Sequence, residues 1–242
     1  MTNKQRILLI LSVALSIAIW GFLYGPVVGT AFTLSLLFHE YGHYYWMGRE
    51  GIRDKTMIMM PPFGAVAMSK ESWPSLGAEA RIALAGPGFG LVSAVVLLLA
   101  GMASGSYEIM IAAFAVCLVN LLNFWTPVAV LDGGRVVKSL LFSFNANLGF
   151  GFYTFSLIAL IFLVGYFFSI FTLVLGFLIY RILESDRFAM WNTISSGKLI
   201  RMSRQELVST ALWFLVVSVG LYTVMTASGV KYADFISYII SK

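Results

Sequence analysis

The chain contains two histidines, His39 and His43, and they lie four residues apart near the end of a long apolar segment. On an α-helix, positions i and i+4 share one face, so both imidazoles can point at a single metal ion. Glu40 follows the first histidine, and its carboxylate can take a proton from a water molecule at that metal. The alternative is a pair of interfacial histidines at the end of a membrane helix. Because ionisable residues are costly inside a membrane, their presence favours a functional site.

Two histidines do not complete a catalytic zinc site, which normally has three protein ligands and one open position. The single cysteine, Cys117, lies inside an apolar run and offers no thiolate cluster, so we expect a carboxylate as third ligand. Asp132 is the strongest candidate, because apolar sequence precedes it and Gly133-Gly134, which allow close backbone packing, follow it. A nearby Zn²⁺, one per chain, would offset the cost of burying its charge. The alternative role, a helix N-cap, is compatible with metal binding.

The composition is that of a membrane protein. Hydrophobic residues make up 60% of the chain and charged residues 11%, whereas a soluble domain carries about 25% charged residues. Several apolar runs exceed the ~20 residues that span a lipid bilayer as a helix. The basic pI of about 9.4 could indicate a nucleic-acid partner. Because the basic residues are spread over short loops, we expect no nucleic acid to bind.

The elements that position these residues are predicted to be helices. We expect an all-α polytopic membrane protein of about six to seven transmembrane helices, with a short re-entrant or β-hairpin-like loop after the second. The first span is expected to be retained, because its apolar stretch is longer than that of a signal peptide. An amphipathic helix is expected to end near residue 144, and another to form the tail, residues 231–242. The expected spans are residues 7–24, 27–46, 76–103, 107–125, 147–165, 166–183 and 206–227.

The stretch between the second and third spans is broken by Pro61-Pro62 and Gly64. Two short apolar runs on either side, within residues 57–68, predict an extended hairpin or re-entrant loop. The alternative is an interfacial loop lying on the headgroups. Phe63 and Gly64 are candidate substrate-binding residues, since an unwound substrate strand could pair with an edge of this loop. Residues 85–90 are expected to form a kink or a small-residue face for close helix contact.

The chain divides into four expected segments. These are a first transmembrane segment (1–26), a catalytic membrane core (27–144), two spans with a basic cytoplasmic loop (145–204), and a last span with its tail (205–242). With seven spans and a cytoplasmic N-terminus, all lysines and arginines except Lys231 and Lys242 fall on the cytoplasmic side, as the positive-inside rule requires. The histidine motif and Asp132 then share the cytoplasmic end, and we expect the protein to lie in the cell membrane.

These motifs together resemble the site-2 protease family of intramembrane zinc metalloproteases. The resemblance implies that His39, His43 and Asp132 bind zinc and that Glu40 is the catalytic base. It also implies an asparagine that positions the substrate. The family's asparagine lies three residues before a proline, where this chain has Phe124, so Asn123 and Asn120 are both candidates. The matching pieces run in the family's order across residues 27–144: His39-Glu40-Tyr41-Gly42-His43, Pro61-Pro62-Phe63-Gly64, Ala85-Gly86-Pro87 and Leu131-Asp132-Gly133-Gly134-Arg135.

The expected function is hydrolysis of a peptide bond in or near a transmembrane helix of a membrane-protein substrate, close to the cytoplasmic face, as part of regulated intramembrane proteolysis. One alternative is a prenyl-protein-type membrane metalloprotease with a glutamate such as Glu184 as third ligand. Another is a non-catalytic zinc-binding membrane protein. The presence of Glu40 argues against the latter, because zinc storage needs no base beside the ligands. The oligomeric state, the substrate and its trigger are not encoded in these motifs.

Overall fold

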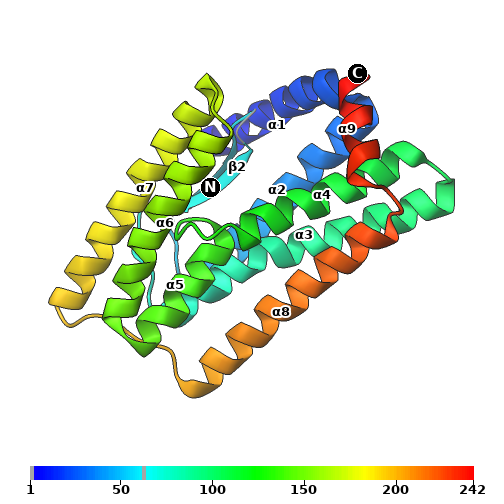
Figure 1. Cartoon of the computed structure of the whole chain (residues 1–242). Coiled ribbons are helices and arrows are strands. Elements are labelled where there is room, and N and C mark those ends of the chain that lie inside the picture. Colours follow the sequence, from blue (N-terminus) through cyan, green and yellow to red (C-terminus); the bar gives the residue numbers. More distant parts are fainter. Residues whose placement is uncertain (1–2, 62–63) are drawn as a thin grey trace. The chain divides into compact units, whose positions relative to one another are not determined.

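The computed structural model describes residues 3–61 and 64–242, and helices dominate this part of the chain (Figure 1). The single sheet described has two strands and follows the second helix, so the expected fold class, all-α with one hairpin, is confirmed. In chain order the elements are α1 (Asn3–Tyr24), α2 (Pro26–Arg49), β1 (Lys55–Met59), β2 (Ala65–Ser69), α3 (Leu76–Ser104), α4 (Tyr107–Trp125), α5 (Asp132–Phe144), α6 (Ala146–Tyr166), α7 (Ile170–Ser195), α8 (Arg204–Ala227) and α9 (Tyr232–Ile240).

Each expected span corresponds to one long helix: α1, α2, α3, α4, α6, α7 or α8. Among the described residues, five helices (α1, α3, α4, α6 and α8) are long and apolar enough to cross a membrane by length and composition. The protein is therefore a multi-pass membrane protein. Helix α2 falls outside this set, and it carries the polar motif with both histidines and Glu40. Helix α7 also falls outside it and carries several charged residues in its second half.

The end of the sixth expected span differs from the prediction. A basic loop was expected directly after residue 183, but α7 continues without a break to Ser195. Between residue 183 and Gly197 the sequence contains no glycine or proline, and Gly197 has a positive φ of 68° shortly after the helix ends. Charged residues alone do not end a helix, so Arg181 and Arg187 lie on α7 and not in a loop.

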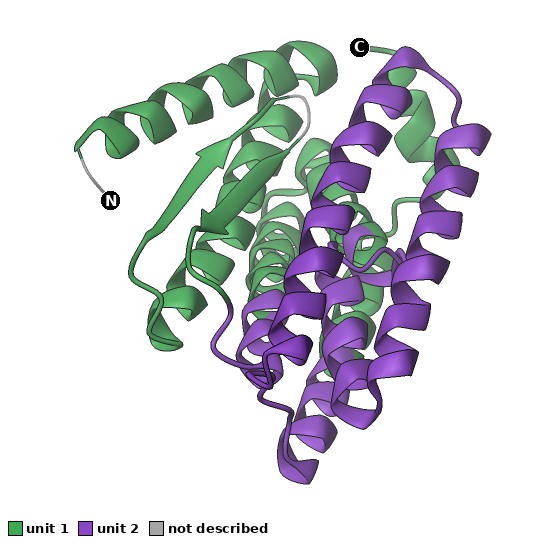
Figure 2. Ribbon diagram, turned by 90° about the vertical axis from the view of Figure 1, so that its left-hand side faces the viewer, with its two compact units in different colours: residues 1–72, 85–122, 215–242 green, residues 73–84, 123–214 purple. Residues whose placement is uncertain are grey.

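The described residues divide into two compact units (Figure 2). One comprises residues 1–72, 85–122 and 215–242, and the other residues 73–84 and 123–214. Helices α3, α4 and α8 each contribute residues to both units. The division of the chain into four segments stays a prediction.

In the first unit, the β1–β2 hairpin packs along α1 and α2 (Figure 2). The strands are antiparallel, with Met57 opposite Ala67 and Met59 opposite Ala65. Gly64 has a φ of 109°, a conformation that favours glycine, which explains its place beside the turn. The predicted hairpin is thus confirmed, and the candidate substrate-binding residue Phe63 lies outside the described residues.

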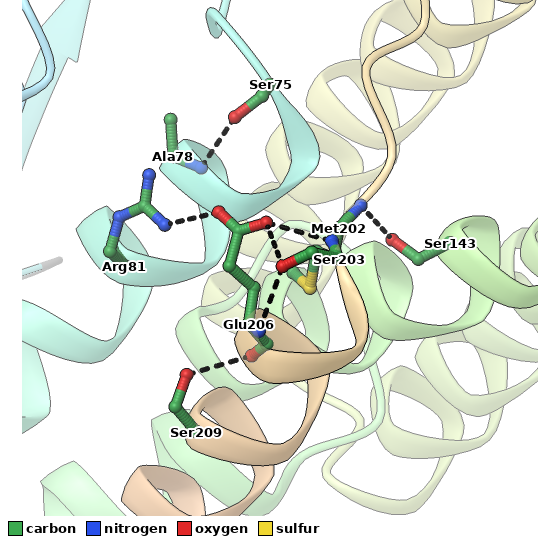
Figure 3. Close-up of polar contacts among 8 residues, drawn as sticks. All are labelled: Ser75, Ala78, Arg81, Ser143, Met202, Ser203, Glu206 and Ser209. Atoms are coloured by element: carbon green, nitrogen blue, oxygen red, sulfur yellow. Dashed lines mark hydrogen bonds and ion pairs between the residues drawn. The ribbon is translucent and has the colours of Figure 1, made fainter.

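In the second unit, α5, α6 and α7 pack around a core that includes Phe142, Tyr153 and Leu183. The start of α8 is fixed by Glu206, whose carboxylate accepts hydrogen bonds from the backbone N–H and the hydroxyl of Ser203 (Figure 3). The same carboxylate forms a 3.0 Å ion pair with Arg81 near the start of α3. This contact ties together two helix ends that are far apart in the sequence.

Glu71 joins the two ends of the hairpin segment. Its carboxylate accepts hydrogen bonds from the backbone N–H groups of Asp54 (2.6 Å) and Arg53 (2.8 Å). These bonds favour the charged form and lower the pKa of Glu71. The stabilisation is therefore present at neutral pH and is lost as the pH falls through the lowered pKa.

We expect hydrogen exchange at the Arg53 and Asp54 amides, corrected for intrinsic rates, to lose protection at low pH. Glu71→Ala should remove that protection already at neutral pH; equal protection in this variant would contradict the assignment.

Candidate metal centre

His39 and His43 lie on one face of α2, as the sequence predicted, and both are buried. Their Nε2 atoms are 3.1 Å apart, so the two rings converge on one point. Two nitrogens bound to one tetrahedral zinc at about 2.0–2.1 Å lie about 3.3 Å apart. The donor atoms and their spacing therefore fit a zinc ion held by both histidines.

Asn120 on α4 orients the first histidine. Its side-chain oxygen lies 2.8 Å from His39 Nδ1, and its amide nitrogen donates to the carbonyl of Val116. Because the NH₂ group of Asn120 is bonded to the Val116 carbonyl, the side-chain oxygen of Asn120 faces His39 and accepts the proton on Nδ1. This tautomer leaves Nε2 with a lone pair for a metal, and a hydrogen bond of this kind typically orients a histidine ligand.

Helices α2 and α3 approach closely beside the histidines. A Cβ placed on Gly42 would lie 2.6 Å from the backbone oxygen of Ala85 and 2.9 Å from the Phe89 ring. A Cβ on Gly86 would overlap His43 Nε2 and lie 2.6 Å from His39 Nε2. Residues 85–90 therefore form a small-residue contact face, one of the two predicted roles, and Gly86 leaves space at the point where the imidazoles converge.

Gly86→Ala should disrupt this centre, because the added methyl group occupies the position next to both Nε2 atoms. We expect the zinc affinity of the purified protein to fall at least tenfold, measured by competition with a chelator of known affinity. Gly88→Ala is the matched control, since a Cβ at Gly88, also on α3, meets nothing within 4 Å. Equal zinc affinity in the two variants would show that the histidines do not bind metal where they converge.

Glu40 is half-buried on α2, next to His39. Its Oε2 accepts a 2.6 Å hydrogen bond from the backbone N–H of Ala67 in β2. The hairpin thus contacts the candidate base directly, a contact that joins residues 27 positions apart and that no local pattern in the sequence indicates.

Asp132 lies in the second unit as the first residue of α5, directly after the N-cap Leu131, and it is buried. Its side chain accepts a 2.5 Å hydrogen bond from the amide of Asn123. A Cβ on Gly133 would overlap the backbone of Phe124, and one on Gly134 the backbone of Val128. The Gly-Gly pair therefore permits the close backbone packing expected of it.

The alternative ligand, Glu184, is also in the second unit and lies on α7. Its carboxylate forms a 2.7 Å ion pair with Arg187 one turn later, and its side chain is 34% exposed. A carboxylate neutralised by arginine is a poorer metal ligand than one oriented by a neutral amide.

The asparagines have roles that sequence reasoning did not assign. Asn120 contacts His39 and Asn123 contacts Asp132, so each contacts a candidate ligand side chain. Their spacing of three residues in an apolar helix was the available signal, because buried amides require partners. Their predicted contact with substrate stays a prediction, as does that of Gly64.

Residues 28–115 match the family model of Peptidase family M50. This match confirms the resemblance to the site-2 proteases. The chain is also similar to Zinc metalloprotease MJ0392 of Methanocaldococcus jannaschii, with 30% identity over 115 residues, which cover 45% of this chain and 32% of the relative. The chain thus matches about a third of the length of that curated relative. The matched residues 28–115 contain both histidines, Glu40 and the hairpin, whereas Asn120 and Asp132 lie beyond the match.

Proposed function

We propose that this chain is a membrane-embedded zinc endopeptidase that cuts a peptide bond in or near a transmembrane segment of another membrane protein. The observation that carries the proposal is the convergence of His39 and His43 at 3.1 Å with Glu40 beside them on the same helix. The similarity to a family of peptidases and to a protein named zinc metalloprotease supports the same reaction class.

We take Asp132 as the third ligand. Its burial, its amide partner Asn123 and its place at the start of α5 support this role. Asn120 and Asn123 are three residues apart on α4, and residues at this spacing are neighbours on a helix surface. Asn123 contacts Asp132 as Asn120 contacts His39, and this parallel supports Asp132 as a ligand. Glu184, in contrast, is engaged by Arg187.

The chain's own residues supply the proton transfers. When bound, zinc would polarise the scissile carbonyl and make water a stronger acid. Glu40 would take a proton from the attacking water and deliver it to the leaving amine, as a general base and then a general acid. Asn120 would hold His39 in the required tautomer throughout the cycle.

The membrane setting restricts the substrate. Five described helices have the length and composition of membrane spans, so the substrate class that this environment offers is a protein with a transmembrane helix. A helical peptide bond is shielded by its own hydrogen bonds, so the substrate must unwind locally. The outer edge of β2 offers backbone partners for the extended strand. The proposal includes an orientation with the catalytic end toward the cytoplasm. It also includes a location in the cell membrane and a role in regulated proteolysis.

The decisive test is cleavage of a single-span membrane protein by the purified chain in detergent or liposomes. We expect cleavage that a zinc chelator abolishes and that added zinc restores. If no member of a single-span substrate library is cut by zinc-loaded protein, a non-catalytic zinc-binding role is favoured and the proposal falls.

The third ligand is tested separately by zinc content. Asp132→Ala should lower the zinc affinity by about a hundredfold or more, because a catalytic site with two protein ligands binds the ion weakly. Glu184→Ala should retain zinc. The reverse result, loss in Glu184→Ala and retention in Asp132→Ala, would favour the prenyl-protease-type arrangement.

A further inference from the structure

The hairpin has a definite hydrogen-bonding register. Its turn is closed by the N–H of Met60, which donates to the carbonyl of Gly64 at 2.8 Å. Along an antiparallel pair, hydrogen-bonded and non-hydrogen-bonded residue pairs alternate. The two residues within each of the pairs Ile58–Val66 and Thr56–Met68 are therefore hydrogen-bonded to each other. In the pairs Met57–Ala67 and Met59–Ala65, the backbone N–H and C=O groups point away from the partner strand.

Two further hydrogen bonds agree with this register. The N–H of Met59 points away from β2 and donates to the hydroxyl of Ser12 on α1. The N–H of Ala67 points away from β1 and donates to Glu40 Oε2 at 2.6 Å. Ala65, Ala67 and Ser69 therefore form the outward edge of β2, and the middle donor of this edge is bound to the catalytic base.

An extended peptide that adds to β2 needs the same donor. Strand addition pairs the peptide's carbonyls with the outward N–H groups of the edge. The Ala67 N–H cannot make a full hydrogen bond to Glu40 and to a peptide carbonyl at once. A peptide paired at Ala67 must therefore displace the Glu40 carboxylate.

We propose that the Ala67 amide is a shared donor, which holds Glu40 in the empty protein and passes to a substrate carbonyl when an extended segment pairs with β2. Glu40 is then released to accept a proton at the moment the substrate arrives. Ala67 acts here as a positioning residue through its backbone, and its side chain plays no part. The inference rests on the proposed proteolytic function and adds to it a coupling between substrate pairing and base release.

The first half of the proposal is tested without turnover. Hydrogen exchange at the Ala67 amide should be slow in the wild type and at least tenfold faster in Glu40→Ala, which removes the acceptor. Glu40→Gln keeps an acceptor oxygen and should keep most of the protection. Equal exchange in all three proteins would overturn the contact in solution.

The second half is tested by separating KM from kcat for a transmembrane substrate. Ala65→Pro removes a neighbouring outward donor that does not bind Glu40, so it should raise KM about three- to tenfold. Ala67→Pro removes the donor that the substrate and Glu40 share. The substrate then loses one hydrogen bond but no longer has to displace Glu40, so KM should rise less than in Ala65→Pro. An at least tenfold lower kcat in Ala67→Pro would show instead that the amide holds Glu40 during catalysis. Equal increases in KM, or no increase in Ala65→Pro, would also overturn the proposal.

Replacing Ala65 or Ala67 by lactic acid removes the N–H while keeping the methyl side chain, so the same comparison can be made if a proline variant does not fold. Bound zinc should be equal in all variants. A wild type that cuts nothing overturns the proposed function itself. If the wild type is active but the variants lack the expected difference in KM, only the shared-donor proposal is overturned.

Discussion

Glu40→Gln is expected to lower the rate of substrate cleavage by about 10²–10⁴-fold while the protein keeps its zinc. Glutamine has nearly the same shape as glutamate but cannot accept the proton from the attacking water. The variant also keeps an oxygen that can accept the hydrogen bond from Ala67, so the hairpin contact is not removed. Cleavage of a transmembrane substrate and zinc per chain, measured on the same preparation, check this result.

Glu40→Asp is the matched control, because it keeps the carboxylate and shortens the side chain by one methylene group. We expect activity between those of the wild type and the glutamine variant. Full activity in Glu40→Gln would refute the general-base role. Loss of both zinc and activity would show that Glu40 holds the metal and does not transfer protons.

Lys138→Met is expected to destabilise the protein by about 3–5 kcal/mol, because it leaves the buried carboxylate of Glu79 and the partly buried carboxylate of Asp186 without their cation. Lys138 on α5 is fully buried and forms ion pairs with Glu79 (2.6 Å) and Asp186 (2.7 Å). Tyr153 donates a further 2.7 Å hydrogen bond to Asp186. This charge cluster joins α3, α5, α6 and α7 within the second unit. Thermal unfolding in detergent should show a fall in Tm on the order of 10 °C.

Arg187→Met provides the comparison, since it breaks an exposed pair with Glu184 that contributes about 1 kcal/mol or less. A neutral cluster, in which Lys138→Met is combined with Glu79→Gln and Asp186→Asn, should recover part of the lost stability. If Lys138→Met melts at the same temperature as Arg187→Met, the cluster does not stabilise the second unit.

The long helices could be predicted because their apolar runs exceed the length of a bilayer span and are separated by glycine, proline and charge. The boundary between α6 and α7, placed at Gly165-Tyr166 on length alone, agrees with α6 ending at Tyr166. The hairpin could be predicted because Pro61 and Gly64 interrupt two short apolar runs. The end of α7 could not be predicted, because charged residues are compatible with both a loop and an exposed helix face.

The histidine pair was recognisable because its members lie about one helical turn apart, and Glu40 because it directly follows the first histidine. Contacts between distant residues carry no such signal. Only the fold brings Glu79, Lys138 and Asp186 into one cluster, since Lys138 is 59 positions from Glu79 and 48 from Asp186 in the sequence. The contact of Asn120 with His39, 81 residues apart, was equally invisible, although a buried asparagine in an apolar helix indicated that some partner exists.

The contacts of the hairpin also change what its two edges offer to a second copy of the chain. A two-stranded ribbon is only marginally stable alone, and an open strand edge is a template on which a second chain can add. Here a side chain from a neighbouring helix contacts each edge, Ser12 on β1 and Glu40 on β2. Both acceptors interrupt the row of donors that a neighbouring copy would need for continuous pairing. Glu40, the proposed catalytic base, thus also occupies an edge donor that a second copy of the chain would need.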